Sequence, residues 1–276
     1  MNMTEQIIRL ALFEDACLGD VTTESIFLHP QETTGIIVAK EDFILAGVDV
    51  AKKVFHAVDP SMACKIHFND SDTIKKDDII FTITGDIRSL LTSERVALNF
   101  LQRLSGIATL TRKFVTALDN PKVRLVDTRK TTPGWRKIEK DAVRAGGGYN
   151  HRFALYDGIL IKDNHIAAAG SIAAAVFHVR ARVSHLMKIE VEVSDLDQVQ
   201  QALEVRADVI MLDNMDIDTM AKAVKLISKR AVVEASGNVS LHTLNAIAGT
   251  GVDVISCGAL THQAVSVDLS MRIAED

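Results

Sequence analysis

The first 110 residues alternate between short apolar runs and turns. Four of the runs are β-like, and apolar positions at helical spacing mark a helix at 48–56. Because such elements bury their apolar faces only against one another, this part is predicted to be an α+β unit with a sheet on a helical layer. The predicted strands are residues 36–40, 43–46, 64–68 and 79–83.

A longer helical pattern follows. Apolar side chains recur at helical spacing from residue 89 to 118. The pattern predicts either one long helix or two helices that abut near Gly106, and Thr92 or Ser93 is expected to cap the start.

Beyond residue 120, short apolar strands alternate with helices. Continuous Val/Ile/Leu runs are typical of strands buried on both faces of a parallel sheet, which needs right-handed helical crossovers. The simplest architecture is a closed or nearly closed α/β barrel, and the alternative is a doubly wound open sheet. The predicted strands are residues 123–127, 159–163, 188–193, 209–213, 232–236 and 254–258.

Composition and charge argue against several classes of protein. The formal net charge of -5 argues against a general nucleic-acid binder. The three cysteines, Cys17, Cys64 and Cys257, lack the paired spacing of a zinc site or a disulfide framework, which fits a reducing cytoplasm. No apolar run reaches 18 residues, and no signal-like segment opens the chain. We therefore expect a cytoplasmic protein that neither crosses a membrane nor binds nucleic acid.

Basic side chains collect at the predicted strand ends. Arg129 and Lys130 follow the first strand of the second part, His151 and Arg152 precede the next, and Lys162 ends it. The carboxyl ends of parallel strands open on one face, where barrel enzymes place their active sites. Arg grips carboxylate or phosphate with a planar fork and Lys adds a mobile charge, so the mixture indicates a polyanionic ligand.

Structural roles compete with this interpretation. Surface ion pairs explain Arg136, Lys137 and Lys140, which lie on a predicted helix, better than they explain cations at strand ends. His151 can equally be a structural imidazole, and Cys257 a small buried apolar residue. No Ser-His-Asp order, GxSxG elbow or CxxC pair supports covalent catalysis.

Carboxylates accompany the cations. Glu190 and Glu192 are two apart on a strand and so face one side, and Asp213 ends the next strand. Mg²⁺ prefers one or two carboxylates together with water and substrate oxygens. Glu192 and Asp213 are therefore predicted to serve a metal, directly or through substrate or water, while ion pairing is an equal alternative for Glu190.

Glycine turns follow two of the strands. Residues 236–238 and 257–259 each come after a strand and before a predicted helix, an arrangement that aims backbone N–H groups at an anion. An ordinary tight turn is the alternative for both. The glycine triplet at 146–148 allows close backbone approach but is a weak signal alone.

Eight longer motifs are spread along the chain. They are GDVTT from Gly19, SERVALNFLQRLSGIAT from Ser93, DTRKTTPGWRKIEKDAVRAGGGYNHRF from Asp127, LIKDNH from Leu160, EVEV from Glu190, MLDN from Met211, EASGN from Glu234 and SCGALTH from Ser256. Together they resemble quinolinate phosphoribosyltransferase over nearly the whole chain. The one departure is Cys257, where the family usually has an aliphatic residue.

The resemblance implies an α/β fold in two domains. An N-terminal α/β sandwich would span 1–112, and a C-terminal open α/β barrel carrying the catalytic site would span 113–276, with N-terminal residues and a C-terminal helix packing across the boundary. It also implies a homodimer or higher homo-oligomer in which each active site borrows residues from the partner.

The implied reaction joins quinolinate to phosphoribosyl pyrophosphate in the presence of Mg²⁺. The products are nicotinate mononucleotide, pyrophosphate and carbon dioxide, a step of de novo NAD biosynthesis. By motif position the implied catalytic residues are Lys130, Lys162, Glu192 and Asp213. The implied substrate-binding residues are Arg95, reaching in from the other subunit, Thr128, Arg129, Lys130, His151, Arg152, Lys162, Glu192, Asp213, Ser236, Gly237, Asn238, Cys257, Gly258 and Ala259.

Two other functions compete with this reaction. A transferase acting on nicotinate or another carboxylate would keep the phosphate turns and the strand-end acids, but a monocarboxylate needs fewer cations than this chain offers. A non-catalytic sensor of phosphorylated metabolites would need the basic pocket but not Glu192 and Asp213.

Overall fold

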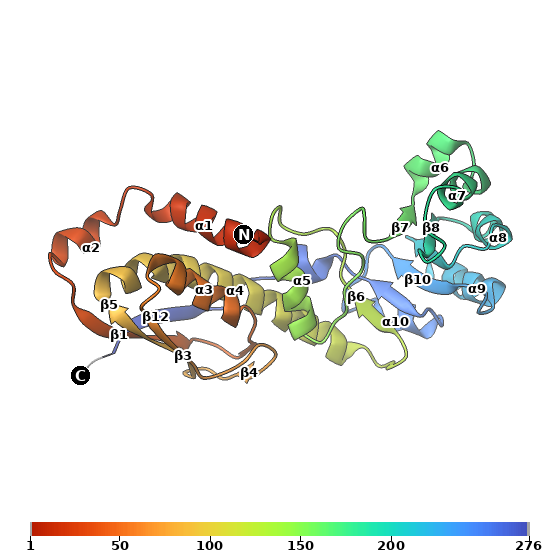
Figure 1. Ribbon diagram of the computed structural model, residues 1–276. Coiled ribbons are helices and arrows are strands. Elements are labelled where there is room, and N and C mark those ends of the chain that lie inside the picture. The colour runs from red at the N-terminus through yellow and green to blue at the C-terminus, as the bar shows by residue number, and fades with distance from the viewer. Residues whose placement is uncertain (1, 275–276) are drawn as a thin grey trace. The chain divides into compact units, whose positions relative to one another are not determined.

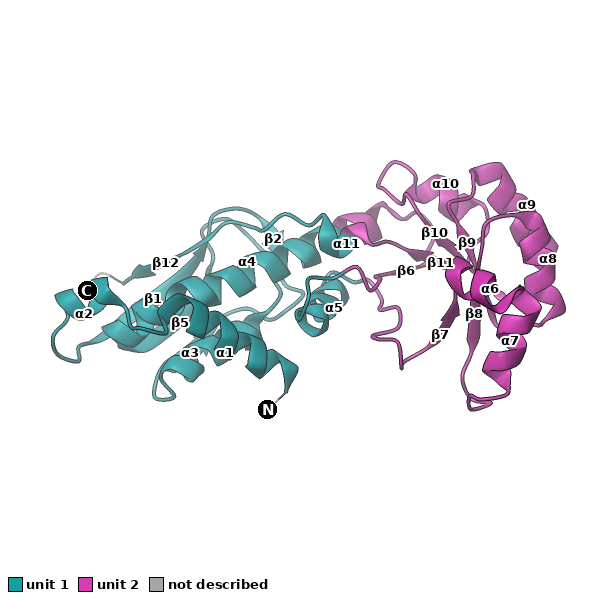
Figure 2. Cartoon of the chain, turned by 90° about the horizontal axis from the view of Figure 1, so that it is seen from above, with its two compact units in different colours: residues 1–112, 131–147, 260–276 teal, residues 113–130, 148–259 magenta. Residues whose placement is uncertain are grey.

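The computed structural model describes residues 2–274 and divides into two compact units (Figure 2). The predicted N-terminal domain, 1–112, lies within unit 1, which also takes in two stretches that the prediction assigned to the C-terminal domain. Unit 1 comprises Met1–Arg112, Thr131–Gly147 and Leu260–Asp276, and unit 2 comprises Lys113–Lys130 and Gly148–Ala259.

An antiparallel sheet with helices beside it forms unit 1 (Figure 1). Its strand order is β12-β1-β5-β3, and a small separate sheet pairs β2 with β4. The prediction of a sheet on a helical layer is confirmed. The strands are β1 Glu32–Ala39, β2 Phe43–Ile44, β3 Ala63–Ile66, β4 Thr73–Ile74, β5 Ile79–Asp86 and β12 Leu269–Ile273, and the first three helices are α1 Met3–Ala16, α2 Val21–Ile26 and α3 Val48–Val58.

The end of the chain completes this sheet. Strand β12 pairs antiparallel with β1, with Leu269 opposite Ala39 and Ile273 opposite Gly35. The helix nearest this end, α11 Ala259–His262, comes before the strand, and the expected packing of a C-terminal helix across the boundary stays a prediction. The pairing of β12 with β1 explains why the last segment belongs to unit 1.

The long helix α4, Ile87–Ala117, is continuous. Of the two alternatives, one long helix is confirmed. A Cβ at Gly106 would lie 2.1 Å from the Val265 carbonyl oxygen, so this glycine lets a second backbone approach the helix. The expected caps are wrong, since the helix begins earlier. Ser93 lies inside it and donates its hydroxyl to the Ser89 carbonyl at 2.7 Å.

Helix α5, Arg136–Ala145, tests the expectation of surface ion pairs. Lys137 does form one, with Nζ 2.7 Å from Asp141 Oδ1. Lys140 is only 2% exposed, so the surface role expected for it is wrong. One face of the helix, which also carries the buried Glu139, packs into unit 1.

Unit 2 is built on an open six-stranded parallel sheet of order β6-β11-β10-β9-β8-β7. Apolar strand residues such as Val191, Ile210 and Ile255 are fully buried, as their continuous runs predicted. Helices alternate with the strands and lie outside them (Figure 2). The strands are β6 Arg124–Val126, β7 Ile159–Ile161, β8 Ile189–Val193, β9 Val209–Asp213, β10 Val232–Ser236 and β11 Val254–Ser256, and the helices are α6 Asp163–Ala169, α7 Ile172–Arg180, α8 Leu196–Glu204, α9 Ile217–Ile227, α10 Leu244–Gly249 and α11 Ala259–His262, which runs on into unit 1.

The predicted α/β fold, with an open parallel sheet in the second part, is confirmed. Within residues 2–274, no helix combines the length and the apolar character that crossing a bilayer requires.

Candidate functional site

The predicted site residues gather at the carboxyl ends of the parallel strands of unit 2. Lys162 directly follows β7, Asp213 closes β9, Ser236 closes β10 and Cys257 directly follows β11. Parallel strands end on a common side of their sheet, so these positions share one edge. His151 and Arg152 lie instead in the segment between β6 and β7, and Arg95 is exposed on α4 of unit 1.

The guanidinium of Arg152 lies close enough to Arg129 to be affected by its charge. Burial, and then the positive charge of Arg129, lower the pKa of the Arg152 guanidinium, while Glu190 acts in the opposite direction. Arg152 Nη1 donates to the Gly158 carbonyl at 2.8 Å, which fixes the side chain. Two like charges held together in a partly buried place favour an anionic ligand between them.

Thr128 stabilises the turn that carries Arg129. Its hydroxyl oxygen accepts the backbone N–H of Lys130 at 3.0 Å. Lys130 itself is exposed. The contacts of all three with substrate stay predictions.

The two predicted metal-serving carboxylates already contact neighbouring polar groups. Lys162 Nζ pairs with a carboxylate oxygen of Glu192. Ion pairing, the alternative considered for Glu190, therefore applies to Glu192 as well. Asp213 Oδ2 accepts the side-chain amide of Asn214 at 2.9 Å. Hard oxygen donors on the adjacent strands β8 and β9 fit Mg²⁺ that arrives on a pyrophosphate, since that ion keeps water and substrate oxygens as ligands.

A second pair of acids lies deeper. Glu190 on β8 and Glu234 on β10 approach the imidazole of His151, with Nε2 3.3 Å from Glu190 Oε2 and 3.5 Å from Glu234 Oε1. Burial, and then the negative charge of Glu190, raise the pKa of Glu234 to about 7, against lowering effects of His151 and the Ser256 hydroxyl. Near neutral pH, Glu234 therefore holds a proton for part of the time.

Glu234→Gln is expected to change how stability depends on pH. The folded protein keeps the Glu234 proton up to a pKa of about 7, whereas the unfolded chain loses it near 4.5. The free energy of unfolding of the wild type therefore decreases as the pH rises between these two values. The fall is on the order of 3 kcal/mol. Urea denaturation of both proteins between about pH 5 and pH 7 measures it, and only the variant should lack it. Equal pH slopes would contradict the raised pKa.

Asn214 is a site residue that the predictions did not select. Its side-chain carbonyl accepts the Asn238 amide at 3.1 Å, and its own amide donates to Asp213, so it ties the end of β9 to the turn after β10. Gly237 in that turn has φ +96°, and a Cβ there would lie 2.1 Å from Asn214 Oδ1. The only sequence signal was the position of Asn214 at the end of MLDN. The helix expected after this turn is α10, which begins at Leu244.

Gly237→Ala is expected to weaken both folding and phosphate binding. It adds backbone strain at positive φ, about 1–3 kcal/mol, and a clash with Asn214. The matched control is Gly170→Ala, because Gly170 has φ +90° and no atom within 4 Å of an added Cβ. Thermal denaturation and calorimetry with phosphoribosyl pyrophosphate should show a larger loss at position 237. Equal losses would mean that strain alone acts.

Cys257 turns its polar groups toward the protein. Its thiol is buried and donates weakly to the Val239 carbonyl at 3.8 Å, and its backbone N–H donates to the Val126 carbonyl at 2.9 Å. Its side chain is therefore the small buried residue that the sequence analysis gave as the structural alternative. The phosphate contact predicted for the backbone of residues 257–259 stays a prediction.

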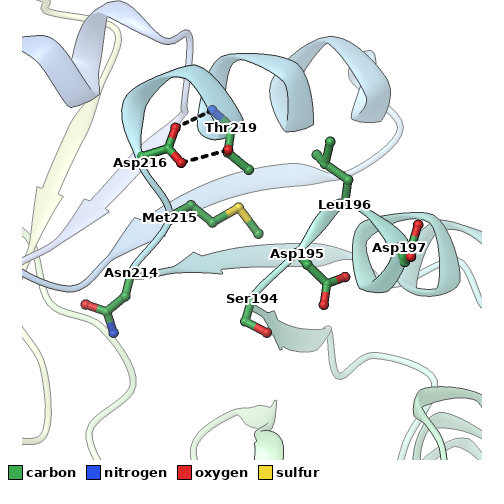
Figure 3. Close-up of a pocket in the computed structure, with 8 residues that line it drawn as sticks. All are labelled: Ser194, Asp195, Leu196, Asp197, Asn214, Met215, Asp216 and Thr219. Carbon is green, nitrogen blue, oxygen red and sulfur yellow. Dashed lines mark hydrogen bonds between the residues drawn. The ribbon is translucent and has the colours of Figure 1, made fainter.

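A hollow of about 460 Å³ lies between the turns that follow β8 and β9, and Asn214 lines it (Figure 3). Asp195 and Asp216 line it and cap α8 and α9, each accepting a backbone N–H at 2.8 Å. Its lining includes Asp197 and no basic side chain, so it does not suit phosphate. It is lined by Ser194, Asp195, Leu196, Asp197, Asn214, Met215, Asp216 and Thr219.

Comparison with known proteins identifies relatives over the whole length. The chain is 46% identical over 269 residues to the probable nicotinate-nucleotide pyrophosphorylase [carboxylating] of Bacillus subtilis, covering 98% of this chain and 93% of that protein. Among solved structures, NadC from Streptococcus pyogenes is 43% identical with a TM-score of 0.93, covering 98% of this chain and 96% of the other. The nicotinate-nucleotide pyrophosphorylase of Francisella tularensis is 40% identical with a TM-score of 0.93, covering 99% and 96%.

Two family descriptions match the chain. Quinolinate phosphoribosyl transferase, N-terminal domain, matches residues 20–105, and Quinolinate phosphoribosyl transferase, C-terminal domain, matches residues 107–272. The resemblance carried by the motifs is thereby confirmed. The chain belongs to the quinolinate phosphoribosyltransferase family.

Proposed function

We propose that the chain transfers a phosphoribosyl group from phosphoribosyl pyrophosphate to quinolinate, giving nicotinate mononucleotide, pyrophosphate and carbon dioxide, a step of NAD biosynthesis. The observation that carries the proposal is a set of three cations: Arg129 after β6, Lys162 after β7 with its partner Glu192, and Arg152, whose pKa the charge of Arg129 lowers. A dicarboxylate is the ligand that this number of cations suits.

In this proposal the quinolinate carboxylates bind Arg129, Arg152 and Lys162, and Lys130 and His151 assist. Arg95 reaches in from a second subunit. Fixed donors around the ring would orient its nitrogen toward the sugar carbon, and such orientation supplies a large part of a transferase's rate enhancement.

Phosphoribosyl pyrophosphate would occupy the neighbouring strand ends. Glu192 and Asp213 would serve the ribose and the pyrophosphate, while the turns at 236–238 and 257–259 would receive the 5′-phosphate. Mg²⁺ held near Glu192 and Asp213, directly or through substrate and water, would neutralise charge on the leaving pyrophosphate.

The chemistry follows from these charges. The carboxylates of Glu192 and Asp213 would stabilise an oxocarbenium-like ribose as pyrophosphate leaves, and Lys130 and Lys162 would balance negative charge. Carbon dioxide would leave once the ring nitrogen is bonded to the sugar, because that positive nitrogen can receive the electrons. Carbon dioxide released without phosphoribosyl pyrophosphate would contradict this order.

A homodimer or larger homo-oligomer completes the proposal. Exposed large apolar side chains cluster on and around α1 and α2, as expected of a surface that is covered in an assembly. We place the protein in the cytoplasm, which suits three cysteines that form no disulfide within the described residues. The exposed apolar residues are Met3, Leu10, Phe13, Leu18, Val21, Ile26 and Leu28.

The test is a product assay of the purified protein with phosphoribosyl pyrophosphate, Mg²⁺ and either quinolinate or nicotinate. Nicotinate mononucleotide from quinolinate alone is the expected result. Product from nicotinate alone would move the protein to the rival transferase, and binding by calorimetry without product from either would favour the metabolite sensor.

A further inference from the structure

The imidazole of His151 contacts the protein through both of its ring nitrogens. Nδ1 accepts the backbone N–H of Arg152 at 2.8 Å. A nitrogen that accepts a hydrogen bond carries no proton, so a neutral ring must carry its proton on Nε2.

Nε2 faces two buried carboxylates. Glu190 is 7% exposed and Glu234 is 4% exposed, and Nε2 lies 3.3 Å and 3.5 Å from their nearest oxygens. Within residues 2–274, Glu190 Oε1 and Glu234 Oε1 have no hydrogen-bond partner, so the 3.5 Å approach of Nε2 to Glu234 Oε1 is an electrostatic contact and Glu190 Oε2, at 3.3 Å, is the nearer acceptor. Buried acceptors favour any donor within reach, and the Nε2–H of His151 is aimed at this pair.

Two further contacts fix the segment that carries the ring. The backbone N–H of His151 donates to Asp127 Oδ1 at 2.9 Å, and Asp127 is fully buried. Arg152 Nη1 donates to the Gly158 carbonyl. His151 and Arg152 are therefore held at the backbone, at the imidazole and at the guanidinium.

We propose that Glu190 and Glu234 are positioning residues: through His151, they fix the backbone of Arg152 and so aim its guanidinium at a substrate carboxylate. Neither acid touches the substrate. His151 then contributes to quinolinate binding by positioning Arg152, and not by contacting the substrate itself. This inference takes the identity of the substrate from the proposed function. The relay itself, meaning the contacts that run from the two glutamates through His151 to the backbone of Arg152, does not depend on that function.

The first test needs no substrate and no activity. Nitrogen NMR of protein with ¹⁵N-labelled histidine reports which ring nitrogen carries the proton, and loss of the signals in His151→Asn assigns them among the nine histidines. The expected result is the Nε2–H form of His151. The Nδ1–H form would overturn the proposal, because Nδ1 could not then accept from Arg152.

The second test separates positioning from substrate contact. Glu190→Ala and Glu234→Ala should each raise the Michaelis constant for quinolinate about tenfold or more and leave that for phosphoribosyl pyrophosphate within about twofold. Glu190→Gln and Glu234→Gln keep an acceptor oxygen and should stay within about threefold of wild type. An exposed acid of unit 2 gives the control Glu204→Gln, which should behave as wild type.

The outcomes distinguish the proposals. Gln variants as impaired as the Ala variants would overturn positioning, as would Ala variants with an unchanged constant for quinolinate. If the Ala variants fail to fold, as judged by thermal denaturation, the Gln variants and the NMR result decide. A wild-type protein that makes no product from quinolinate while showing the Nε2–H form would refute the proposed function and leave the relay in place.

Discussion

Arg152→Ala is expected to lower kcat/KM for quinolinate about a hundredfold, mainly through the Michaelis constant. The guanidinium is partly buried beside Arg129 and fixed by the Gly158 carbonyl, so its loss removes a charge-assisted donor that water cannot replace in the same geometry. Steady-state kinetics with each substrate varied in turn measures the effect. The constant for phosphoribosyl pyrophosphate should stay within about twofold.

Arg182→Ala is the matched control, because Arg182 is exposed in the turn after α7 and lies far along the chain from the predicted strand-end cations. It should behave as wild type. Arg129→Ala should resemble Arg152→Ala. Unchanged constants for quinolinate in both of these variants would remove the two arginines from the carboxylate site.

Mixing two inactive variants is expected to restore activity. If Arg95 serves the site of the partner, a hybrid dimer of Arg95→Ala and Arg129→Ala subunits contains one intact site and one site with both defects. Random reassociation of an equal mixture makes half of the dimers hybrids, so activity should rise to about a quarter of wild type. Assays after unfolding and refolding the mixture measure the recovery.

The control mixture pairs Arg129→Ala with Arg152→Ala. Both residues lie in unit 2, so every site in a hybrid carries one defect and no recovery is expected. Failure of the first mixture to recover, with hybrid dimers demonstrated by differently tagged subunits, would mean that Arg95 does not act across an interface.

Several strand positions in unit 2 were predictable because the strand is an apolar run that ends in a polar residue. The bounds of β9 and β10 match the prediction, since Asp213 and Ser236 mark where burial ends. Strand β12 was missed because its partner β1 lies more than 200 residues earlier in the chain, and no local pattern encodes that pairing. The packing role of Gly106 was not predictable for a similar reason, because the backbone that it admits, at Val265, is distant in sequence.

In the candidate site, too, features set by the local sequence were predictable, and contacts between distant segments were not. Motif positions selected residues at strand ends, and the structure places those of unit 2 at one edge of the sheet. The Glu190–Glu234 pair joins β8 to β10 across the intervening β9, so neither spacing nor periodicity could predict it. Burial of Lys140 was unpredictable because helical periodicity gives the relative orientation of side chains but not which neighbours cover them.

The pairing of β12 with β1 also affects how the chain folds during synthesis. Strand β1 lies between β5 and β12, and only β5 is available until the final residues leave the ribosome. Through most of translation, one hydrogen-bonding edge of β1 therefore stays open, a state that invites pairing with other nascent chains. A chain that terminates before residue 269 would keep that edge permanently, so truncated products of this protein should aggregate although unit 2 is already complete.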